Sequence, residues 1–351
     1  MTEAPATPAT PRSRRGLYIP LVLLALVCLG WTGFWFYAKS RAIEIMDAWM
    51  TRESRLGRHW TCPERAIGGF PFRFEVTCAN PTYTSDQPSR QGKGTLAGLT
   101  VTARVVDPRQ VIAAFTAPLK WTGEAGDSVD VTFASARASY RGSGRQLDDL
   151  SIEFDKPSFT YTVPGLPQQT VAAARSDFHL RQAPGSDPAT DLALSATALR
   201  SDALNQLMKD EAPGNLTFRT RLTKLLPSPP KDWRETADLW RLAEGEAKVE
   251  TLSFAKGQVA LNLTGVLRLD ELRRPEGEIT GTAQGIAALM QAFGLSMGGN
   301  TGAAGGLLGT LLSGGKPQSQ GQPKALPFAL RFDQGRMYIG PFPGPRLRPL
   351  Y

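Results

Sequence analysis

The amino-acid sequence predicts a mainly β fold with a few short helices (α+β), built as a curled antiparallel sheet or an open barrel or groove and preceded by one transmembrane helix. The chain of 351 residues holds 35 glycines and 27 prolines, a composition that suits strands joined by turns. Many segments alternate apolar and polar residues with a period of two, which indicates strands with one apolar face. One uncharged stretch, residues 17–38, is long enough to cross a bilayer.

This uncharged stretch is predicted to be a transmembrane signal anchor. At about 1.5 Å per residue, a helix over residues 17–38 spans a hydrocarbon core about 30 Å thick. Tyr18 stands near one end of it, and Trp31, Trp35 and Tyr37 stand toward the other, as interfacial aromatic residues do. No small-x-small cleavage site follows the stretch, so we expect the helix to be retained after export.

The flanking charges do not settle the orientation of the anchor, because basic residues lie on both sides of it: Arg12, Arg14 and Arg15 before it, and Lys39, Arg41, Arg52, Arg55 and Arg58 after it. Long C-terminal domains, however, translocate largely regardless of charge. We therefore expect residues 1–16 to be a cytoplasmic tail and the chain from residue 39 onward to lie on the extracytoplasmic side of the membrane.

Two of the three cysteines support this orientation. Cys62 and Cys78 fit neither a CxxC motif nor a zinc pattern. In an oxidising compartment they are expected to form a disulfide, which at this spacing stabilises a fold by about 3 kcal/mol. Two buried thiols are the alternative. Cys28 lies inside the anchor.

Residues 39–57 are predicted to form an amphipathic stalk helix, and residues 58–351 a β-rich domain. In the stalk, Ile43, Met46, Trp49 and Met50 recur at three- and four-residue steps.

The first clear strand of the domain lies within residues 67–78, where apolar side chains occupy every second position from Phe70 to Cys78. Pro71 has no N–H group to donate, so we expect the strand to start there or to run at a sheet edge.

The rest of the domain is predicted to consist mostly of strands. The predicted strands lie around residues 96–101, 129–133, 150–154, 159–163, 178–180, 192–194, 216–218, 249–269 (two or three strands, with a bulge at Gly265), 328–332 and 337–339. The predicted helices follow Asp107-Pro108 and lie near residues 201–209, 231–244 and 284–297. Residues 298–325, rich in Gly, Ser and Gln, are predicted to form a flexible loop.

A faint internal repeat also appears in the sequence. Residues 99–104 followed by 111–115 resemble residues 279–283 followed by 289–293, each as a strand and then a short helix ending in Ala-Phe.

The sequence contains no recognisable catalytic motif. His59 and His179 have no second histidine at metal spacing, so we expect structural roles for both. Ser143 stands directly between two glycines, which is not the GxSxG spacing, and the Gly-rich segments lack the phosphate-loop pattern. We expect no catalytic, cofactor-binding or metal-binding residues, and no enzymatic activity.

The net charge of +8 is scattered along the chain without a dense basic run, which argues against nucleic-acid binding. The same charge allows a weak attraction to anionic lipid headgroups. The apolar face of the predicted sheet has two interpretations: the core of a closed barrel or sandwich, or a groove for acyl chains in an open curled sheet. The alternation pattern fits both.

Several segments together resemble the bacterial domain-of-unknown-function 2125 family: GRHWTC at residues 57–62, GGFPFRFEVTCANP at 68–81, WRLAEGEAKVETLSF at 240–254, LTGVLRLD at 263–270, PEGEITG at 275–281 and LRFDQGRMYIGPFPGP at 330–345. The resemblance covers nearly all of residues 40–350. Its most specific residues are Gly69, Phe70, Pro71 and Phe72, with Gly335, Gly340 and Pro341 near the C-terminus. That family supplies no catalytic residues.

In style the sequence is similar to the AsmA-like envelope proteins, in which one inner-membrane helix precedes a periplasmic β-sheet folded as a lipid-holding groove. The resemblance implies a single-pass protein of the bacterial inner membrane with a periplasmic domain. The expected function is non-enzymatic binding of lipid or another hydrophobic ligand in envelope maintenance. The alternative is an envelope scaffold or assembly factor that binds proteins through its sheet; no particular protein partner is predicted.

Overall fold

The computed structural model describes residues 15–87, 90–143, 146–185, 187–225, 233–285, 325–340 and 342–351. Most of the predicted cytoplasmic tail, most of the predicted helix at 284–297, nearly all of the predicted loop at 298–325, and Pro341 lie outside these residues.

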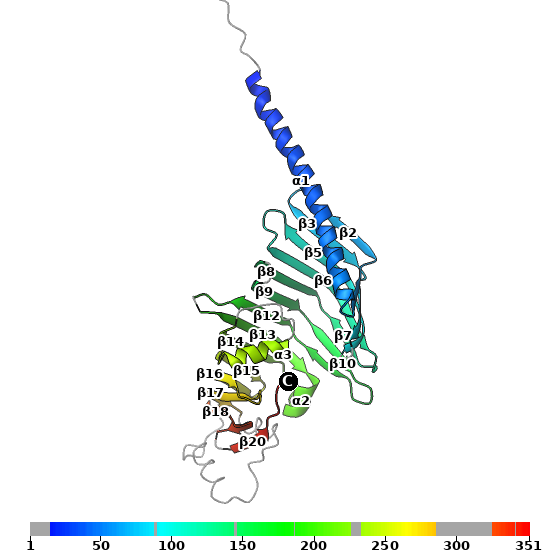
Figure 1. The fold of residues 1–351 in the computed structure, drawn as a ribbon. Helices are drawn as coiled ribbons and strands as arrows, with labels where there is room; N and C mark the ends of the chain where they lie inside the picture. The colour runs from blue at the N-terminus through cyan, green and yellow to red at the C-terminus, as the bar shows by residue number, and fades with distance from the viewer. Residues whose placement is uncertain are drawn as a thin grey trace, which may run out of the picture.

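One long helix, α1 (Arg15–Ser54), joins the predicted anchor and the predicted stalk without interruption (Figure 1). It contains a stretch long and apolar enough to cross a membrane. Side chains from Ile19 to Leu29, including Leu23 and Leu26, are exposed, as a helix surrounded by lipid requires. The C-terminal part of α1 lies against the first strands of the sheet.

The strands form one antiparallel sheet, which confirms the predicted fold class. The strands nearest the N-terminus are β1 (Arg58–Thr61), β2 (Glu64–Gly68), β3 (Arg73–Ala79), β4 (Thr82–Gln87), β5 (Arg90–Arg104) and β6 (Gln110–Gly123). The middle of the chain forms β7 (Ser128–Thr132), β8 (Ser135–Ser143), β9 (Gln146–Asp155), β10 (Ser158–Thr162), β11 (Gln169–Ala172), β12 (Arg175–Gln182) and β13 (Ala189–Ser201). The last strands are β14 (Gly214–Thr223), β15 (Ala247–Lys256), β16 (Val259–Leu269), β17 (Pro275–Gln284), β18 (Leu326–Asp333), β19 (Arg336–Ile339) and β20 (Phe342–Arg346).

In the first part of the sheet the strands pair in two series that lie side by side, which we call lanes. One lane runs β2–β3–β5–β6–β8–β9–β12–β13, and the other runs β1–β4–β5–β6–β7–β10–β11–β13. Strands β5, β6 and β13 are long enough to belong to both lanes. From β13 onward the strands follow one another singly to β20, away from the N-terminal half of α1 (Figure 1).

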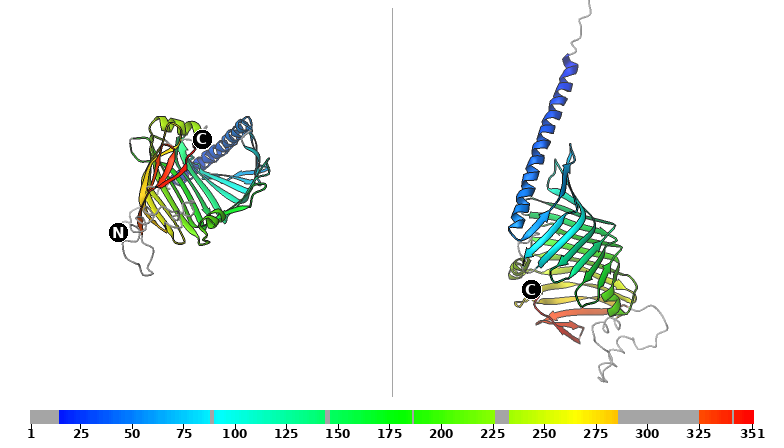
Figure 2. Two further views of the ribbon diagram at one scale, coloured as in Figure 1. Left: turned by 90° about the horizontal axis from the view of Figure 1, so that it is seen from below. Right: turned by 90° about the vertical axis from the view of Figure 1, so that its right-hand side faces the viewer.

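A line of strand breaks separates the two lanes. Backbone hydrogen bonds join the residues at the breaks: Ala134 N donates to Asp155 O, Lys156 N to Ala174 O, and Ala174 N to Thr197 O, all within 2.9 Å. Lys156 and Ala198 adopt φ of +48° and +50° at this line. Such irregularities increase the local bend and twist of a sheet. Figure 2 shows the result, a sheet curled into an open trough.

Two short helices flank the sheet, and both overlap predicted helices. α2 (Asp202–Met208) begins at Ser201, whose hydroxyl accepts a hydrogen bond from Leu204 N at 3.4 Å. α3 (Trp233–Leu242) lies at the ends of β14 and β15, where Trp240 Nε1 donates to Thr223 O at 2.8 Å.

The predicted helix after Asp107-Pro108 is wrong. Residues 110–123 form β6, in which Val111, Ala113 and Phe115 pair with Ala103, Val101 and Leu99 of β5. Because positions i, i+2 and i+4 are apolar here, the segment fits a strand as well as a helix, and pairing with the long β5 decides between them. The helix predicted for residues 111–115 in the first copy of the internal repeat is wrong for the same reason. The helix predicted for residues 289–293 in the second copy lies outside the described residues.

Two strand details also differ from the prediction. The first predicted strand begins at Arg73, and residues 69–72 form the turn before it. The irregularity predicted at Gly265 lies on the neighbouring strand, where β15 gains a residue between Val249 and Leu252.

Candidate functional site

One face of the sheet carries an uninterrupted row of apolar residues that crosses it from β2 to β18. Each member is the direct cross-strand partner of the next. The central row consists of Ile67, Val76, Val101, Ala113, Ala138, Ile152, Phe178, Leu194, Phe218, Leu252, Leu263, Gly281 and Phe328.

Two flanking rows lie on the same face, two residues away along each strand, or three at the bulge of β15. The first consists of Cys78, Leu99, Phe115, Ala136, Phe154, Ser176, Ala196, Leu216, Phe254, Leu261, Ala283 and Leu326. The second consists of Phe74, Ala103, Val111, Tyr140, Leu150, Leu180, Leu192, Thr220, Val249, Gly265, Ile279, Leu330 and Ile339. Together the three rows form a continuous apolar band, which we call the apolar trough.

The opposite face of the sheet is polar. A row one residue away from the central one reads Thr77, Thr100, Ala114, Arg137, Glu153, Asp177, Ser195, Thr217, Ser253, Asn262 and Thr282. Ion pairs lie on this face, including Arg175 with Glu153 and Arg221 with Asp191. This contrast fixes the register, because a one-residue slip would exchange the two faces.

The apolar face is the concave one. Leu263 is only 2% exposed, whereas its strand neighbours Asn262 and Thr264 are exposed. Among the described elements the strands form a single layer, and the helices contact its edge or strand ends. In a single-layer sheet, a side chain becomes this buried when the sheet curls around it, and Figure 2 shows that the sheet is curled.

The trough is packed at its far end and open nearer α1. At the far end Val249, Leu263, Ile279, Phe328 and Ile339 form a buried cluster. Between β3 and β14 most inner side chains are only partly buried, and Leu194 is 37% exposed; the buried exceptions are Cys78, Ala136, Ala196 and Thr220. The apolar face is therefore packed like a core at the far end of the sheet and mostly only partly buried between β3 and β14. With strands about 4.8 Å apart, the central row is roughly 58 Å long.

The end of the trough nearest the N-terminus is attached to α1. Trp31 Nε1 donates to Pro71 O at 2.9 Å, and Trp35 Nε1 donates to Arg73 O at 3.2 Å. The Trp35 ring stacks on Phe74 of the trough, with centroids 5.6 Å apart, and is 3% exposed. The helix that carries the apolar span thus contacts the first strand of the apolar trough directly.

A family model described as an uncharacterized protein conserved in bacteria (DUF2125) matches residues 35–345. The chain belongs to the DUF2125 family. No curated protein and no solved structure matches it. The DUF2125 region begins at Trp35, so it includes the contact of Trp35 in α1 with Arg73 in β3, together with the whole trough.

The first group of residues singled out in the DUF2125 sequence lies at this attachment. Gly69 has φ of +96°, and a Cβ there would lie 2.6 Å from Arg73 O, so the turn requires glycine. Phe70 packs edge-on against Trp35 with ring centroids 5.4 Å apart. Pro71 accepts the Trp31 bond, and Phe72 extends outward.

The second group lies at the opposite end of the sheet, so the structure does not bring the two together. Gly335 and Gly340 occupy the turns on either side of β19, with φ of +71° and +56°. A Cβ on Gly335 would lie 2.2 Å from the Arg274 guanidinium. Both glycines shape turns, and Pro341 is outside the described residues.

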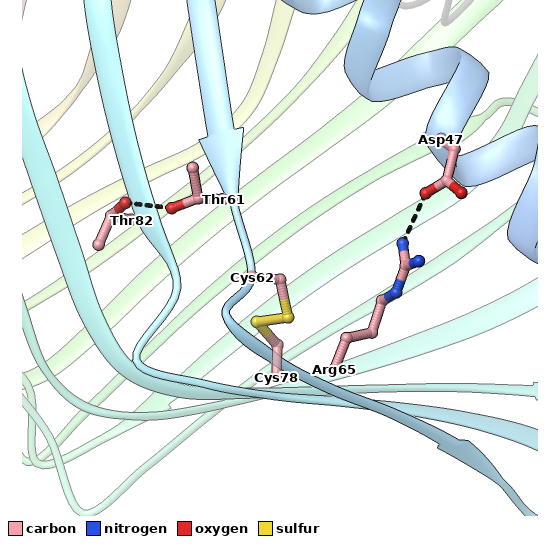
Figure 3. The surroundings of a disulfide bond; sticks show 6 residues. All are labelled: Asp47, Thr61, Cys62, Arg65, Cys78 and Thr82. Atoms are coloured by element: carbon pink, nitrogen blue, oxygen red, sulfur yellow. Dashed lines mark hydrogen bonds and ion pairs between the residues drawn. A yellow bond between two sulfur atoms is a disulfide. The ribbon is translucent and has the colours of Figure 1, made fainter.

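The structure joins Cys62 and Cys78, whose Cα atoms are 5.7 Å apart, in a disulfide between the β1–β2 connection and β3 (Figure 3). Beside it, Arg65 of β2 donates to Asp47 of α1 at 2.7 Å. Cys28 is free and exposed on α1.

A series of aromatic rings that was not predicted from the sequence also packs α1 against the sheet. The rings of Trp49, Trp60, Tyr83 and Trp121 follow one another from α1 across β1, β4 and β6, with centroids 5.9, 4.4 and 5.9 Å apart. The tryptophans at positions 31, 35 and 49 share one side of a helix, because 14 residues are close to four turns. That stripe was the available signal for a helix packed against protein.

Polar groups elsewhere form local pairs. His59 Nε2 lies 3.0 Å from Asp86 Oδ2, and His179 Nδ1 lies 2.9 Å from Ser151 Oγ on the polar face. Hydrogen bonds from Arg221 lower the pKa of the Asp191 carboxyl, and its partial burial acts in the opposite direction. In the described part of the chain, no three His, Cys, Asp or Glu residues are placed to hold a metal ion.

A cavity of about 1090 Å³ lies at the strand ends beside α3. Its described lining includes five basic side chains, Arg221, Lys224, Arg241, Lys248 and Arg268, against three acidic ones. Arg241 Nε is the one buried side-chain nitrogen or oxygen without a hydrogen-bond partner among the described residues. Each of the five basic side chains also pairs with a carboxylate at 3.8 Å or less, and none of them belongs to the apolar rows.

Proposed function

We propose that this protein is a non-enzymatic, single-pass protein of the bacterial inner membrane whose periplasmic sheet holds lipid acyl chains in the apolar trough. The observation that carries the proposal is the continuity of the three apolar rows, most of whose side chains stay only partly buried between β3 and β14. Water in contact with such a band is unfavourable, and each methylene that an occupant removes from water contributes about 0.8 kcal/mol.

The attachment to α1 supports a lipid as the occupant. The helix that carries the candidate membrane span contacts Phe74, an inner residue of the trough, through Trp35. The open end of the trough therefore lies beside the membrane in which α1 would be inserted. Membrane lipid is the most abundant apolar material at that place.

The disulfide supports the proposed orientation, because such bonds persist in oxidising compartments such as the periplasm. The residues of the trough support the non-enzymatic role. Its rows present mainly aliphatic and aromatic side chains, which can bind a chain but offer few groups for proton transfer or nucleophilic attack.

The alternative function, a scaffold that binds proteins through its sheet, requires an edge that accepts another strand. At the far edge, β20 contains Pro343 and Pro345, neither of which has an N–H group to donate. This edge therefore gives less support to the scaffold than the trough gives to lipid binding.

Site-specific photocrosslinking in cells tests the lipid proposal. A photoreactive phenylalanine derivative at Leu194, inside the trough, should form covalent lipid adducts. Mass spectrometry of the purified full-length chain detects these adducts. The matched control is Ala193, on the polar face of the same strand, which should form none. Equal adducts at both positions, or none at Leu194, would contradict the proposal.

A charge substitution gives a second measurement. Leu194→Glu places a carboxylate in the trough, so lipid that co-purifies with the full chain in mild detergent should fall at least about tenfold, the equivalent of 1.4 kcal/mol. Ala193→Glu places the same charge beside Arg219 and His179 on the polar face and should leave the lipid content unchanged.

A further inference from the structure

The turn between β2 and β3, residues 69–72, carries two large apolar side chains that remain at least half exposed. Phe70 is 51% exposed and Phe72 is 71% exposed. Neither belongs to the inner rows of the trough. Exposed phenylalanines next to one another in a tight turn are costly in water and indicate a contact with something apolar.

The turn is fixed at a defined height along α1. Trp31 and Trp35, which donate to Pro71 O and Arg73 O, both precede Ala38, the end of the uncharged stretch. At about 1.5 Å per residue, Trp31 lies roughly 10 Å along the helix from Ala38. A side chain held beside Trp31 therefore lies at the depth of acyl chains rather than of headgroups.

The backbone of the turn is compatible with lipid. Hydrocarbon tolerates non-helical backbone only where its polar groups are satisfied. Arg73 N donates to Gly69 O at 3.1 Å, Trp31 Nε1 donates to Pro71 O, and Val105 N donates to Phe72 O at 3.1 Å. Pro71 has no N–H group. Three of the four carbonyl groups of the turn thus have donors, and both phenylalanine side chains keep at least half of their surface exposed.

Charged side chains border the turn on the side away from the membrane. Arg73 is largely exposed and pairs with Glu75 at 3.1 Å, and Lys39 lies over the Trp35 ring at 5.6 Å. Long basic side chains in such positions extend toward headgroups while their stems stay in an apolar layer.

We propose that the turn of residues 69–72 is inserted, through Phe70 and Phe72, into the bilayer leaflet on the side of the β-domain. The molecule then has a second membrane contact besides the anchor. This contact places Phe74 and Val76, the first inner residues of the trough, at the lipid surface, so that an acyl chain enters without crossing water. The inference rests on the proposed membrane anchoring and deepens the proposed lipid binding by locating its entrance.

Depth-dependent fluorescence quenching tests the insertion. In the full chain, Cys28→Ser removes the free thiol, and Phe72→Cys supplies one site for an environment-sensitive dye, with the Cys62–Cys78 disulfide intact. The chain is reconstituted in vesicles of three parts phosphatidylethanolamine to one part phosphatidylglycerol, with doxyl quenchers on the acyl chains. We expect a blue-shifted emission and at least twofold quenching of the dye.

Two control sites make the outcome decisive. Leu272→Cys labels a leucine that is 59% exposed in the β16–β17 turn, far from α1, and should not be quenched. Val27→Cys labels the exposed face of α1 within the span and should be quenched. Quenching at Val27 without quenching at Phe72 overturns the insertion and leaves the anchor intact. Absence of quenching at both overturns the anchor as well, and equal quenching at Leu272 and Phe72 also contradicts the insertion.

The entrance role has its own measurement. The double variant Phe70→Ser, Phe72→Ser should keep the chain in the membrane fraction through α1 but reduce lipid adducts at Leu194 at least fivefold. The matched variant Leu272→Ser should leave them unchanged. Undiminished adducts in the double variant would show that lipid reaches the trough by another route and would overturn the entrance.

Discussion

Asp191 lies on the polar face between two guanidinium groups. Its carboxylate accepts hydrogen bonds from Arg221 at 2.7 Å and from Arg181 at 3.2 Å. The Arg221 bonds are the main reason that the pKa of Asp191 is lowered in the folded state. A carboxyl whose pKa is lowered by folding stabilises the protein above its unfolded pKa, and that stabilisation disappears as the pH falls through the folded value.

Asp191→Asn should therefore reduce the free energy of unfolding by about 1–3 kcal/mol at pH 7. The difference from the parent chain should shrink as the pH falls below about 4 and vanish at lower pH, because both chains are then uncharged at this position. Thermal unfolding in detergent, followed by tryptophan fluorescence across this range, measures it. Glu244→Gln is the control, because Glu244 is 92% exposed and its pair with Lys224 is weak. A constant difference at all pH values would contradict the assignment.

Leu263 has the largest fully buried side chain on the inner face. Its side chain is 2% exposed and belongs to the buried cluster with Val249 and Ile279. Leu263→Ala should cost about 2–5 kcal/mol of stability, because it leaves a cavity in a packed region. Denaturant unfolding measures this, with the exposed Leu272→Ala as a control expected within about 0.5 kcal/mol of the parent. A small effect of Leu263→Ala would indicate that the far end of the trough is loosely packed.

At the scale of the secondary-structure elements, the line of strand breaks gives the sheet its curl. Ala198 has φ of +50° in this line, a conformation that an alanine adopts at a cost of about 1–2 kcal/mol. Ala198→Gly should relieve this strain, and glycine's greater freedom in the unfolded chain should offset part of the gain, leaving up to about 1 kcal/mol of added stability.

The control for this substitution is Ala196→Gly, two residues earlier in β13. Ala196 is buried and outside the left-handed region, so glycine there should destabilise by about 1 kcal/mol. Chemical denaturation of both variants gives the comparison. Destabilisation of similar size in both would contradict a strained break at Ala198.

Local patterns in the sequence were sufficient for some elements and not for others. α3 was predictable because Trp233, Ala237 and Trp240 recur at helical spacing. β6 was not, since Val111 and Phe115 satisfy both helical and strand spacing and pairing with β5 decides. The breaks near Lys156 and Ala198 were not predictable, because neither residue type favours a positive φ. The pairing of Cys62 with Cys78 followed from their number and setting, whereas the Trp31–Pro71 contact required the three-dimensional arrangement.

The molecule as a whole is expected to place its disulfide outside the cytoplasm. In intact cells Cys62 and Cys78 should be oxidised, so that an alkylating reagent labels them only after reduction and denaturation, while Cys28 does not depend on reduction. A gel shift after labelling measures this. Labelling of both thiols in unreduced, denatured samples would place the domain in a reducing compartment and contradict the proposed orientation.

Removal of the disulfide has a further expected effect. Cys62→Ser with Cys78→Ser should lower stability by about 3 kcal/mol, the chain-entropy estimate for a loop of this size. Because this bond ties the β1–β2 connection to β3, protection from proteolysis should be lost first around residues 58–79, and the far strands should stay protected. Simultaneous loss of protection along the whole sheet would instead indicate one cooperative unit.

The prolines of β20 limit the length of the apolar trough. Because Pro343 and Pro345 cannot extend the hydrogen-bonded ladder, the far end is a terminus, and a second chain cannot lengthen the trough by joining there. One leaflet is about 15 Å thick, half of a hydrocarbon core of about 30 Å. A row of roughly 58 Å whose distal quarter is already filled by its own side chains then accommodates about two or three acyl chains end to end. The proposed lipid binding thus predicts a fixed capacity, with a lipid stoichiometry of a small whole number per chain.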